Sequence, residues 1–319
     1  ILDGSFTGKQ FQIGADSGQT LNVDVDSAAA NEIGAHTFKT DVQIIGGDDA
    51  TITDSATPAM TVTVSGDKGS EDVEFTSPGA SARDLAEAVN ANSAVTGVEA
   101  TATTKAALTL DTAGTISFSL GNSNGDLVSI GDVEIADSND LRDLRDAVNA
   151  VSGGTGITAT LGENASEVIL TDRDGDDIGI EQFNQVDQTP TMTVRTLQAD
   201  GSEKASGTNN EVALDVTTNT DAYVTGQVEM TSTKTFNVAG DNNNAGESFV
   251  EANDSSDFAS VESIDLSTAQ GATDAIKVLD SALQKISQSR SDLGAVSNRL
   301  DSTISNLTNI STNVEAARS

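Results

Sequence analysis

Hydrophobic and polar positions alternate with a period of two near the start of the chain. Phe11-Gln12-Ile13 and the stretch Leu21-Asn22-Val23-Asp24-Val25 both alternate in this way. Between them, residues 14–19 are rich in turn-forming side chains. This arrangement predicts a β-hairpin with one buried face. The small and polar residues 27–40 that follow indicate a connector.

The same alternation continues through residues 41–257, where Thr, Val, Gly, Asp and Asn are frequent. Met60-Thr61-Val62-Thr63-Val64 is a typical stretch, and Gly-Asp, Asn-Gly and Asp-Gly pairs separate many such stretches. A period of two predicts strands that bury one face and turn Thr and Ser side chains outward. The region is therefore expected to be rich in β-structure.

An internal repeat lies within this region, at a constant offset of 59 residues. Residues 84–101 match residues 143–160 without a gap, and 11 of the 18 aligned positions are identical. In the first copy Leu85, Ala88 and Val89 have the spacing of one helix face, and Ser81 with Asp84 indicates a capping box. Each copy predicts a strand, a short helix and a strand. We expect tandem α+β modules near 60–115 and 116–183, followed by a β-rich stretch, 186–257.

The pattern changes to steps of three and four residues towards the end of the chain. Residues 272–317 contain no Pro and one Gly, Gly294, and Arg290 occupies the one missing apolar position. The pattern predicts a single helix of about 45 residues, roughly 65–70 Å long, with a narrow coiled-coil seam. The expected seam residues are Ile276, Leu279, Leu283, Ile286, Leu293, Val296, Leu300, Ile304, Leu307 and Ile310, and the pattern continues to Val314 and Ala317.

Such a seam needs partner helices, and no second long helix is expected elsewhere in the sequence. The partner is therefore expected on another subunit or on a segment outside this sequence. The fold class expected is α+β. Residues 1–40 and 258–319 would form one discontinuous domain, with the long helix packed on the N-terminal hairpin, and residues 41–257 would be inserted between them.

Composition excludes several kinds of chemistry. Cysteine is absent and His36 is the single histidine, so disulfides, thiolate catalysis and multi-histidine metal sites are excluded. Aromatic residues make up 3% of the chain, so cores must be built from Val, Ile, Leu and Ala. His36 is expected on the surface rather than as a catalytic base. No enzymatic activity and no cofactor are expected.

The charge balance is strongly acidic, with 50 acidic against 16 basic residues and a net charge of −34. Nucleic-acid binding needs clustered Lys and Arg, so a nucleic-acid partner is not expected. An anionic membrane surface would repel the chain, and no run of 18 or more apolar residues predicts a membrane span. The acidic surface favours solubility.

Two groups of carboxylates are candidate sites. Asp172, Asp174 and Asp176 alternate around a glycine and could supply oxygen ligands to Ca²⁺, but they lack the spacing of a complete EF-hand loop. A solvated turn between strands is the favoured interpretation. Asp48 and Asp49 could serve as an acid–base pair in glycoside hydrolysis, but so acidic a composition produces adjacent pairs by chance.

The C-terminal segment Ser289–Leu300 closely resembles the C-terminal signature of bacterial flagellins, as does the text from Asn306-Leu307 to Ala316-Ala317-Arg318-Ser319. Residues 263–276 resemble the start of the same helix. The opening Leu2–Phe6 and the hairpin Phe11–Gly18 resemble the segment that follows the N-terminal flagellin helices. The 59-residue repeat resembles a module of flagellins and hook-associated proteins.

This resemblance implies a secreted, extracellular structural protein that polymerises with its own copies into the flagellar filament and serves motility. Arg290 and Arg299 would then make polar contacts between subunits. The family further implies an export chaperone and a host innate receptor as partners. We expect a truncated flagellin that lacks the terminal helices and is monomeric by itself. The alternatives are a hook–filament junction protein and a surface adhesin or glycan-binding protein.

Overall fold

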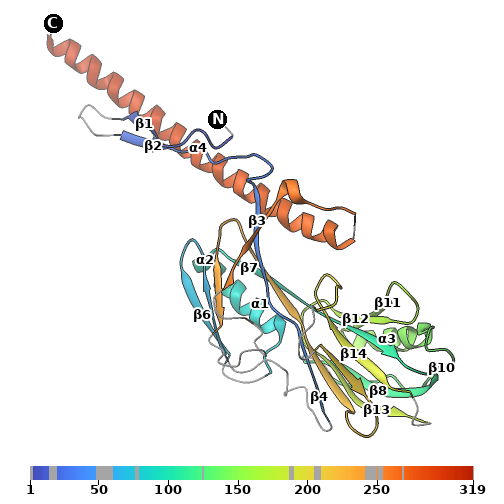
Figure 1. The fold of residues 1–319 in the computed structure, drawn as a ribbon. Helices are drawn as coiled ribbons and strands as arrows, with labels where there is room; N and C mark the ends of the chain where they lie inside the picture. The colour runs from blue at the N-terminus through green and yellow to red at the C-terminus, as the bar shows by residue number, and fades with distance from the viewer. Residues whose placement is uncertain are drawn as a thin grey trace. The chain divides into compact units, whose positions relative to one another are not determined.

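The chain is described by a computed structural model, shown as a ribbon in Figure 1. It describes residues 3–13, 20–47, 60–75, 79–123, 126–186, 190–204, 210–240, 250, 254–267 and 269–318. The predicted hairpin turn at 14–19 and the pair Asp48 and Asp49 lie outside the described residues. Contacts divide the chain into unit 1, residues 1–36 and 258–319, and unit 2, residues 37–257.

Unit 1 combines an antiparallel strand pair with one very long helix. Strand β1 (Lys9–Gln12) pairs with β2 (Thr20–Val23), and Leu21 and Val23 of β2 are buried. After the 3-10 turn η2 (Val261–Ser263), helix α4 runs over Ala269–Arg318. Its 50 residues correspond to about 75 Å. The prediction of a long C-terminal helix is confirmed, and Gly294 does not interrupt it.

Strands β3 (Gly34–Lys39) and β20 (Asp257–Ser260) carry the chain from one unit into the other. The two strands are hydrogen-bonded neighbours in one sheet, although more than 200 residues separate them in sequence. A Cβ on Gly34 would lie 2.0 Å from the carbonyl oxygen of Ala259, so this close approach requires glycine. The connector expected at 27–40 does join the two units, but it contains strand β3, which a partner strand distant in sequence stabilises.

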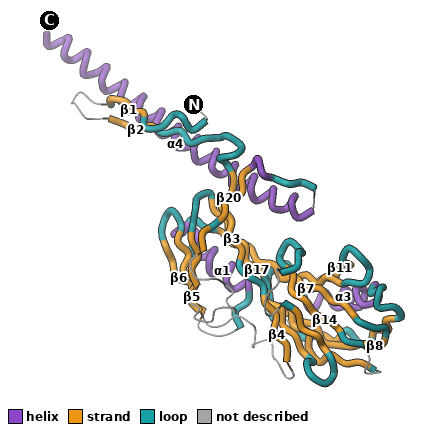
Figure 2. Tube along the Cα trace, in the orientation of Figure 1, coloured by secondary structure: helices purple, strands orange, loops and turns teal. Residues whose placement is uncertain are grey.

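In the described part of unit 2, three sheets and the helices α1 (Ala82–Ala91), α2 (Ser93–Thr96) and α3 (Arg142–Thr155) are present, and Figure 2 draws strands in orange and helices in purple. One sheet has the order β10-β8-β13-β16-β4, with β9 on β8; a second has β11-β12-β7-β17-β3-β20, with β14 on β7 and β15 on β14; the third has β19-β18-β5-β6. A mixed α+β fold is therefore confirmed.

The bounds of these elements follow the chain order. The strands are β4 (Gln43–Gly47), β5 (Met60–Ser65), β6 (Ser70–Phe75), β7 (Glu99–Leu110), β8 (Gly114–Asn122), β9 (Val128–Ser129), β10 (Val133–Ile135), β11 (Thr158–Leu161), β12 (Val168–Asp172), β13 (Ile178–Gln185), β14 (Met192–Leu197), β15 (Glu211–Leu214), β16 (Asp221–Thr225), β17 (Gln227–Ser232), β18 (Asn237–Gly240) and β19 (Asp254–Ser255). The helices are α1 (Ala82–Ala91), α2 (Ser93–Thr96) and α3 (Arg142–Thr155).

The sequence repeat produces the same hydrogen bonds in both copies. The Asn90 amide donates to the Ala100 carbonyl at 2.8 Å and accepts from the Ala100 N–H at 2.8 Å. At the 59-residue offset, the Asn149 amide donates to the Ala159 carbonyl at 2.9 Å and accepts from the Ala159 N–H at 2.8 Å. Each asparagine thus clamps its helix to the strand that follows.

The clamp is expected to contribute measurably to stability. Asn149→Ala removes the partners of two backbone groups of Ala159, and we expect it to lower the free energy of unfolding by about 1–3 kcal/mol. Urea unfolding followed by circular dichroism measures the change. Asn164, exposed on the turn before β12, is the matched control, and Asn164→Ala is expected to be close to neutral. Equal effects of the two substitutions would contradict the clamp.

The two helices of the repeat cover separate hydrophobic cores that share strand β7. One core surrounds α1, and β7 contributes Ala100 to it; the other surrounds α3, and β7 contributes Leu108 and Leu110. The stretch 186–257 divides between them, because β14 to β16 join the α3 core whereas β17 and β18 join the α1 core. Since one helix and a few strands bury little surface, each core recruits strands from distant sequence.

Candidate assembly surface on the long helix

The inner face of α4 is packed within unit 1. Ala275, Val278 and Ala282 are buried near the start of the helix, at steps of three and four residues. The ammonium group of Lys285 donates to the carbonyl oxygen of Glu32 at 3.1 Å, which joins the helix to the N-terminal segment. Figure 1 shows β1 and β2 alongside the same helix. The helix therefore stabilises, and is stabilised by, the N-terminal part of unit 1.

An apolar stripe on α4 remains exposed beside this packed face. The side chains of Ile276 and Leu283 are 60% and 61% exposed, and Leu279, Ile286 and Leu293 are also exposed. Their steps of three, four, three and seven residues place them along one side of the helix. These residues form a row of exposed large aliphatic side chains along the helix.

The predicted seam does not lie on one face of the folded unit. Seven of its ten residues are exposed, whereas Val296, Leu300 and Leu307 are half-buried. A strict seven-residue repeat drifts by about 20° per heptad on a straight helix. From Ile276 to Ile310 the stripe therefore turns by about 100° around the helix.

Arg290 and Arg299, the arginines expected to make polar contacts between subunits, lie exposed on this helix. Arg290 lies between Ile286 and Leu293 along the stripe, and Arg299 follows one heptad after Asp292. Among the described residues, neither guanidinium forms an ion pair within 4.0 Å. An exposed arginine without an ion pair contributes little to the stability of a single chain.

His36 lies on β3 and is half-buried, whereas the sequence predicted a surface position. Its ring centroid lies 5.0 Å from that of Phe258. Burial, and to a lesser extent the positive charge of Lys285, lowers the pKa of His36 below its ordinary value.

The lowered pKa of His36 predicts a pH dependence of stability. The unfolded chain binds a proton more readily than the folded chain, so the free energy of unfolding should fall as pH drops below about 6.5. His36→Gln should remove this component. Urea unfolding of both proteins between about pH 5 and pH 8 measures it. Since the carboxylates are common to both proteins, identical pH profiles would contradict the prediction.

The carboxylates considered for calcium lie in the turn between β12 and β13. Asp172 Oδ1 accepts from the N–H groups of Asp174, Gly175 and Asp176 at 3.0, 3.1 and 3.3 Å, and Asp172 Oδ2 accepts from the Asn122 amide at 2.7 Å. Asp172 thus organises the turn through its own backbone.

This turn is only partly solvated, because Asp174 is exposed whereas the other two carboxylates are buried. Asp172 is 2% and Asp176 4% exposed, and Asp176 forms an ion pair with Arg83 at 3.1 Å. Burial raises the pKa of Asp176, and the hydrogen bond from Arg83 opposes that shift. The partners from α1 and β8, which bury the turn, are distant in sequence. Within the described ranges, no three His, Cys, Asp or Glu side chains converge as metal ligands.

No helix in the described part of the chain is long and apolar enough to cross a membrane. Two models of known protein families match this chain, one on the long helix and one on the internal repeat. The model of the bacterial flagellin C-terminal helical region matches residues 276–319. The model of the flagellin hook IN motif matches residues 61–115 and again residues 115–174. The two matches to one motif follow the 59-residue repeat.

Individual relatives agree with these families. The B-type flagellin of Pseudomonas aeruginosa is 32% identical over 320 residues, covering 100% of this chain and 63% of the relative. Flagellin A of Helicobacter pylori is 28% identical over 350 residues, covering 100% and 65%. The chain thus spans less than two thirds of the length of these relatives.

The solved structures that match are distant. The flagellar cap protein FliD from Escherichia coli, in a crystal structure of its D1-D2-D3 domains, aligns with 60% of this chain and 55% of that one. The sequence identity is 14% and the TM-score 0.21. A similarity this low supports no conclusion about fold or function.

Proposed function

The chain belongs to the bacterial flagellin family, and from this premise we propose that it is the part of a filament subunit that supplies the exposed assembly helix and an inserted outer region. The observation that carries the proposal is the exposed apolar stripe on α4, led by Ile276 and Leu283. It continues along the helix to Leu293, within the segment that matches the flagellin C-terminal helical region.

In this proposal the stripe packs against helices of the same subunit's remaining segments or of neighbouring subunits. Burial of apolar surface contributes about 25 cal/mol per Å², so several large aliphatic side chains supply a substantial driving force. When the same contact is repeated from subunit to subunit and the symmetry does not close into a ring, the product is a helical filament. Arg290 and Arg299 form polar contacts with carboxylates of adjacent subunits. The function is mechanical and extracellular, and no catalytic step is involved.

Unit 2 is proposed as the outer region of the subunit, built on two tandem copies of the repeated module. Its buried hydrophobic residues are organised in two internal cores. A strongly acidic composition, with a net charge of −34 for the chain, favours contact with water and repels like-charged copies. Such a region suits a solvent-facing position better than a packed one.

Immunogold electron microscopy on the source cells, with antibody raised to this chain, tests the proposal. Gold along the whole flagellar filament is the expected result. Gold confined to the base of the filament would replace the proposal with a hook–filament junction protein. Gold on the cell body, with bare filaments, would contradict a flagellar role and favour a surface adhesin.

A further inference from the structure

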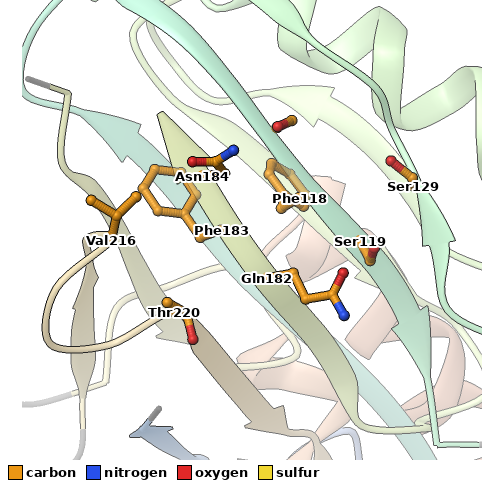
Figure 3. A pocket seen from close by; sticks show the side chains of 9 residues that line it. Phe118, Ser119, Ser129, Gln182, Phe183, Asn184, Val216 and Thr220 are labelled. Carbon is orange, nitrogen blue, oxygen red and sulfur yellow. The ribbon is translucent and has the colours of Figure 1, made fainter. Parts of the chain in front are cut away.

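A hollow in unit 2 has no role in the assembly proposed above. It has a volume of about 530 Å³ and lies on the six-stranded sheet, beside strands β8 and β13. Ser117 and Ser119 of β8 and Gln182 and Asn184 of β13 line it; Thr220 and Val216 border it from the segment before β16, as Figure 3 shows. Its volume lies within the range of small-molecule sites, about 300–1,000 Å³.

A β-bulge creates the polar floor of this hollow. Glu181 pairs with Ser119 and Asn184 with Ser117, so β13 carries one extra residue between these two pairs. Strict alternation from buried Ile180 would direct Gln182 into the core. With the extra residue, Phe183 enters the core instead, and Gln182 is exposed beside Asn184.

The bulge holds Gln182 in an unusual backbone conformation. Its φ is 56°, and it is the one non-glycine residue with positive φ among the described residues. The Gln182 N–H donates to Asp221 Oδ1 at 2.7 Å, and the Phe183 N–H donates to the Thr220 carbonyl at 2.9 Å. Neighbouring strands thus hold a conformation that costs free energy, and such residues gather at binding sites.

The side chains that line the hollow carry no charge. Hydroxyl and amide groups from Ser117, Ser119, Ser129, Thr220, Gln182 and Asn184 each offer both donors and acceptors. No lining side chain is ionisable, although the chain has 50 acidic and 16 basic residues. A phosphate, carboxylate or ammonium ligand would find no opposite charge. The rings of Phe118 and Phe183 are buried, so stacking does not contribute.

We propose that this hollow, the Gln182 pocket, binds a neutral saccharide. Adjacent hydroxyl groups of a sugar donate and accept in the same way as the lining groups, and one or two sugar rings match the volume. Hydrogen bonds exposed to water contribute little each, so the affinity is millimolar rather than micromolar. The inference is independent of the assembly helix, because every residue involved belongs to unit 2.

The test uses the whole chain labelled with ¹⁵N. Lactose and the methyl glycosides of glucose, galactose and N-acetylglucosamine are titrated separately, and the side-chain amide signals of Gln182 and Asn184 are followed by NMR. The pair of amide signals that is lost in Gln182→Ala belongs to Gln182, and Asn184→Ala identifies the Asn184 pair in the same way. The expected result is a saturable shift of both amides with at least one sugar. No saturable shift with any of the four would overturn the proposal.

Variants separate binding from folding. Gln182→Gly removes the amide but suits the positive φ, so it should retain the wild-type resistance to urea while binding at least about fivefold more weakly. Ser119→Ala should weaken binding, because it removes one lining hydroxyl while the backbone pairing of Ser119 with Glu181 beside the bulge is retained. Gln10→Ala, an exposed amide on β1, is the control and should leave the affinity unchanged. Wild-type affinity in both pocket variants would overturn the proposal.

A neutral sugar can arrive free or at the end of a longer glycan. Comparison of lactose with lactose-terminated polyacrylamide distinguishes these sources in the same titration. Equal occupancy per sugar shows that the open pocket accepts glycan ends, and occupancy by lactose alone restricts it to free saccharides. Either result retains the neutral-sugar site.

Discussion

Leu283→Asp in the full-length protein is expected to abolish filament formation while the subunit stays folded. Leu283 is 61% exposed, so the substitution leaves the packed face of α4 at Ala275, Val278 and Ala282 unchanged. In the assembled filament, however, the carboxylate would be buried in an apolar contact. Burial of an unpaired charge costs several kcal/mol, which repetition at every subunit multiplies. Leu293→Asp should have the same effect.

The neighbouring residue supplies a matched control for Leu283. Gln284 is exposed and lies about 100° further round the helix, away from the stripe. Gln284→Asp introduces the same charge and should assemble normally. Electron microscopy and sedimentation of the polymerised protein measure assembly, and circular dichroism reports on the fold. Normal filaments from Leu283→Asp and Leu293→Asp would refute the seam.

Leu144→Ala is expected to lower the free energy of unfolding of unit 2 by about 2–5 kcal/mol. Leu144 lies on α3 and is fully buried in the core that β8, β10 and β11 build around that helix. Its equivalent in the first repeat, 59 residues earlier, is Leu85 on α1, which is buried in the other core. Leu85→Ala should cost a similar amount.

The pair also tests whether the two cores unfold together. Strand β7 contributes to both, so we expect one cooperative transition that either substitution shifts, with nearly additive effects in the double variant. Urea unfolding followed by circular dichroism and by hydrogen exchange measures this. Leu127, 39% exposed, is the control, and Leu127→Ala should change little. Two separate transitions, each shifted by one variant, would contradict the shared-strand coupling.

Local patterns were sufficient for the elements that local interactions determine. The capping box at Ser81 and Asp84 forms as predicted, with the Ser81 side chain accepting from Asp84 N–H and the Asp84 side chain accepting from Ser81 N–H. The long helix forms because its residues include no proline and its apolar spacing is regular. Repetition of one sequence at a 59-residue offset produces repeated helices and repeated asparagine clamps.

Long-range pairing could not be predicted in the same way. Strand β3 lies in a stretch of small and polar residues, and its partner strand β20 lies more than 200 residues away in the sequence. Asp172 and Asp176 belong to an acidic turn whose sequence predicts a solvent-exposed position. Nevertheless, α1 and β8 cover these two side chains and supply their partners Arg83 and Asn122. No pattern near these residues reports which distant side chains will cover them.

The amino-acid pattern determined that α4 carries an apolar seam, because spacing along a helix depends only on its own sequence. The tertiary structure decided which part of that seam is covered within unit 1 and which part stays open, because the drift of a seven-residue repeat has meaning only relative to a neighbouring segment. Tertiary contacts likewise decided the Gln182 pocket. A β-bulge exchanges the buried and the exposed positions of the strand beyond it. The hydrophobic periodicity of that strand alone does not reveal where the bulge lies.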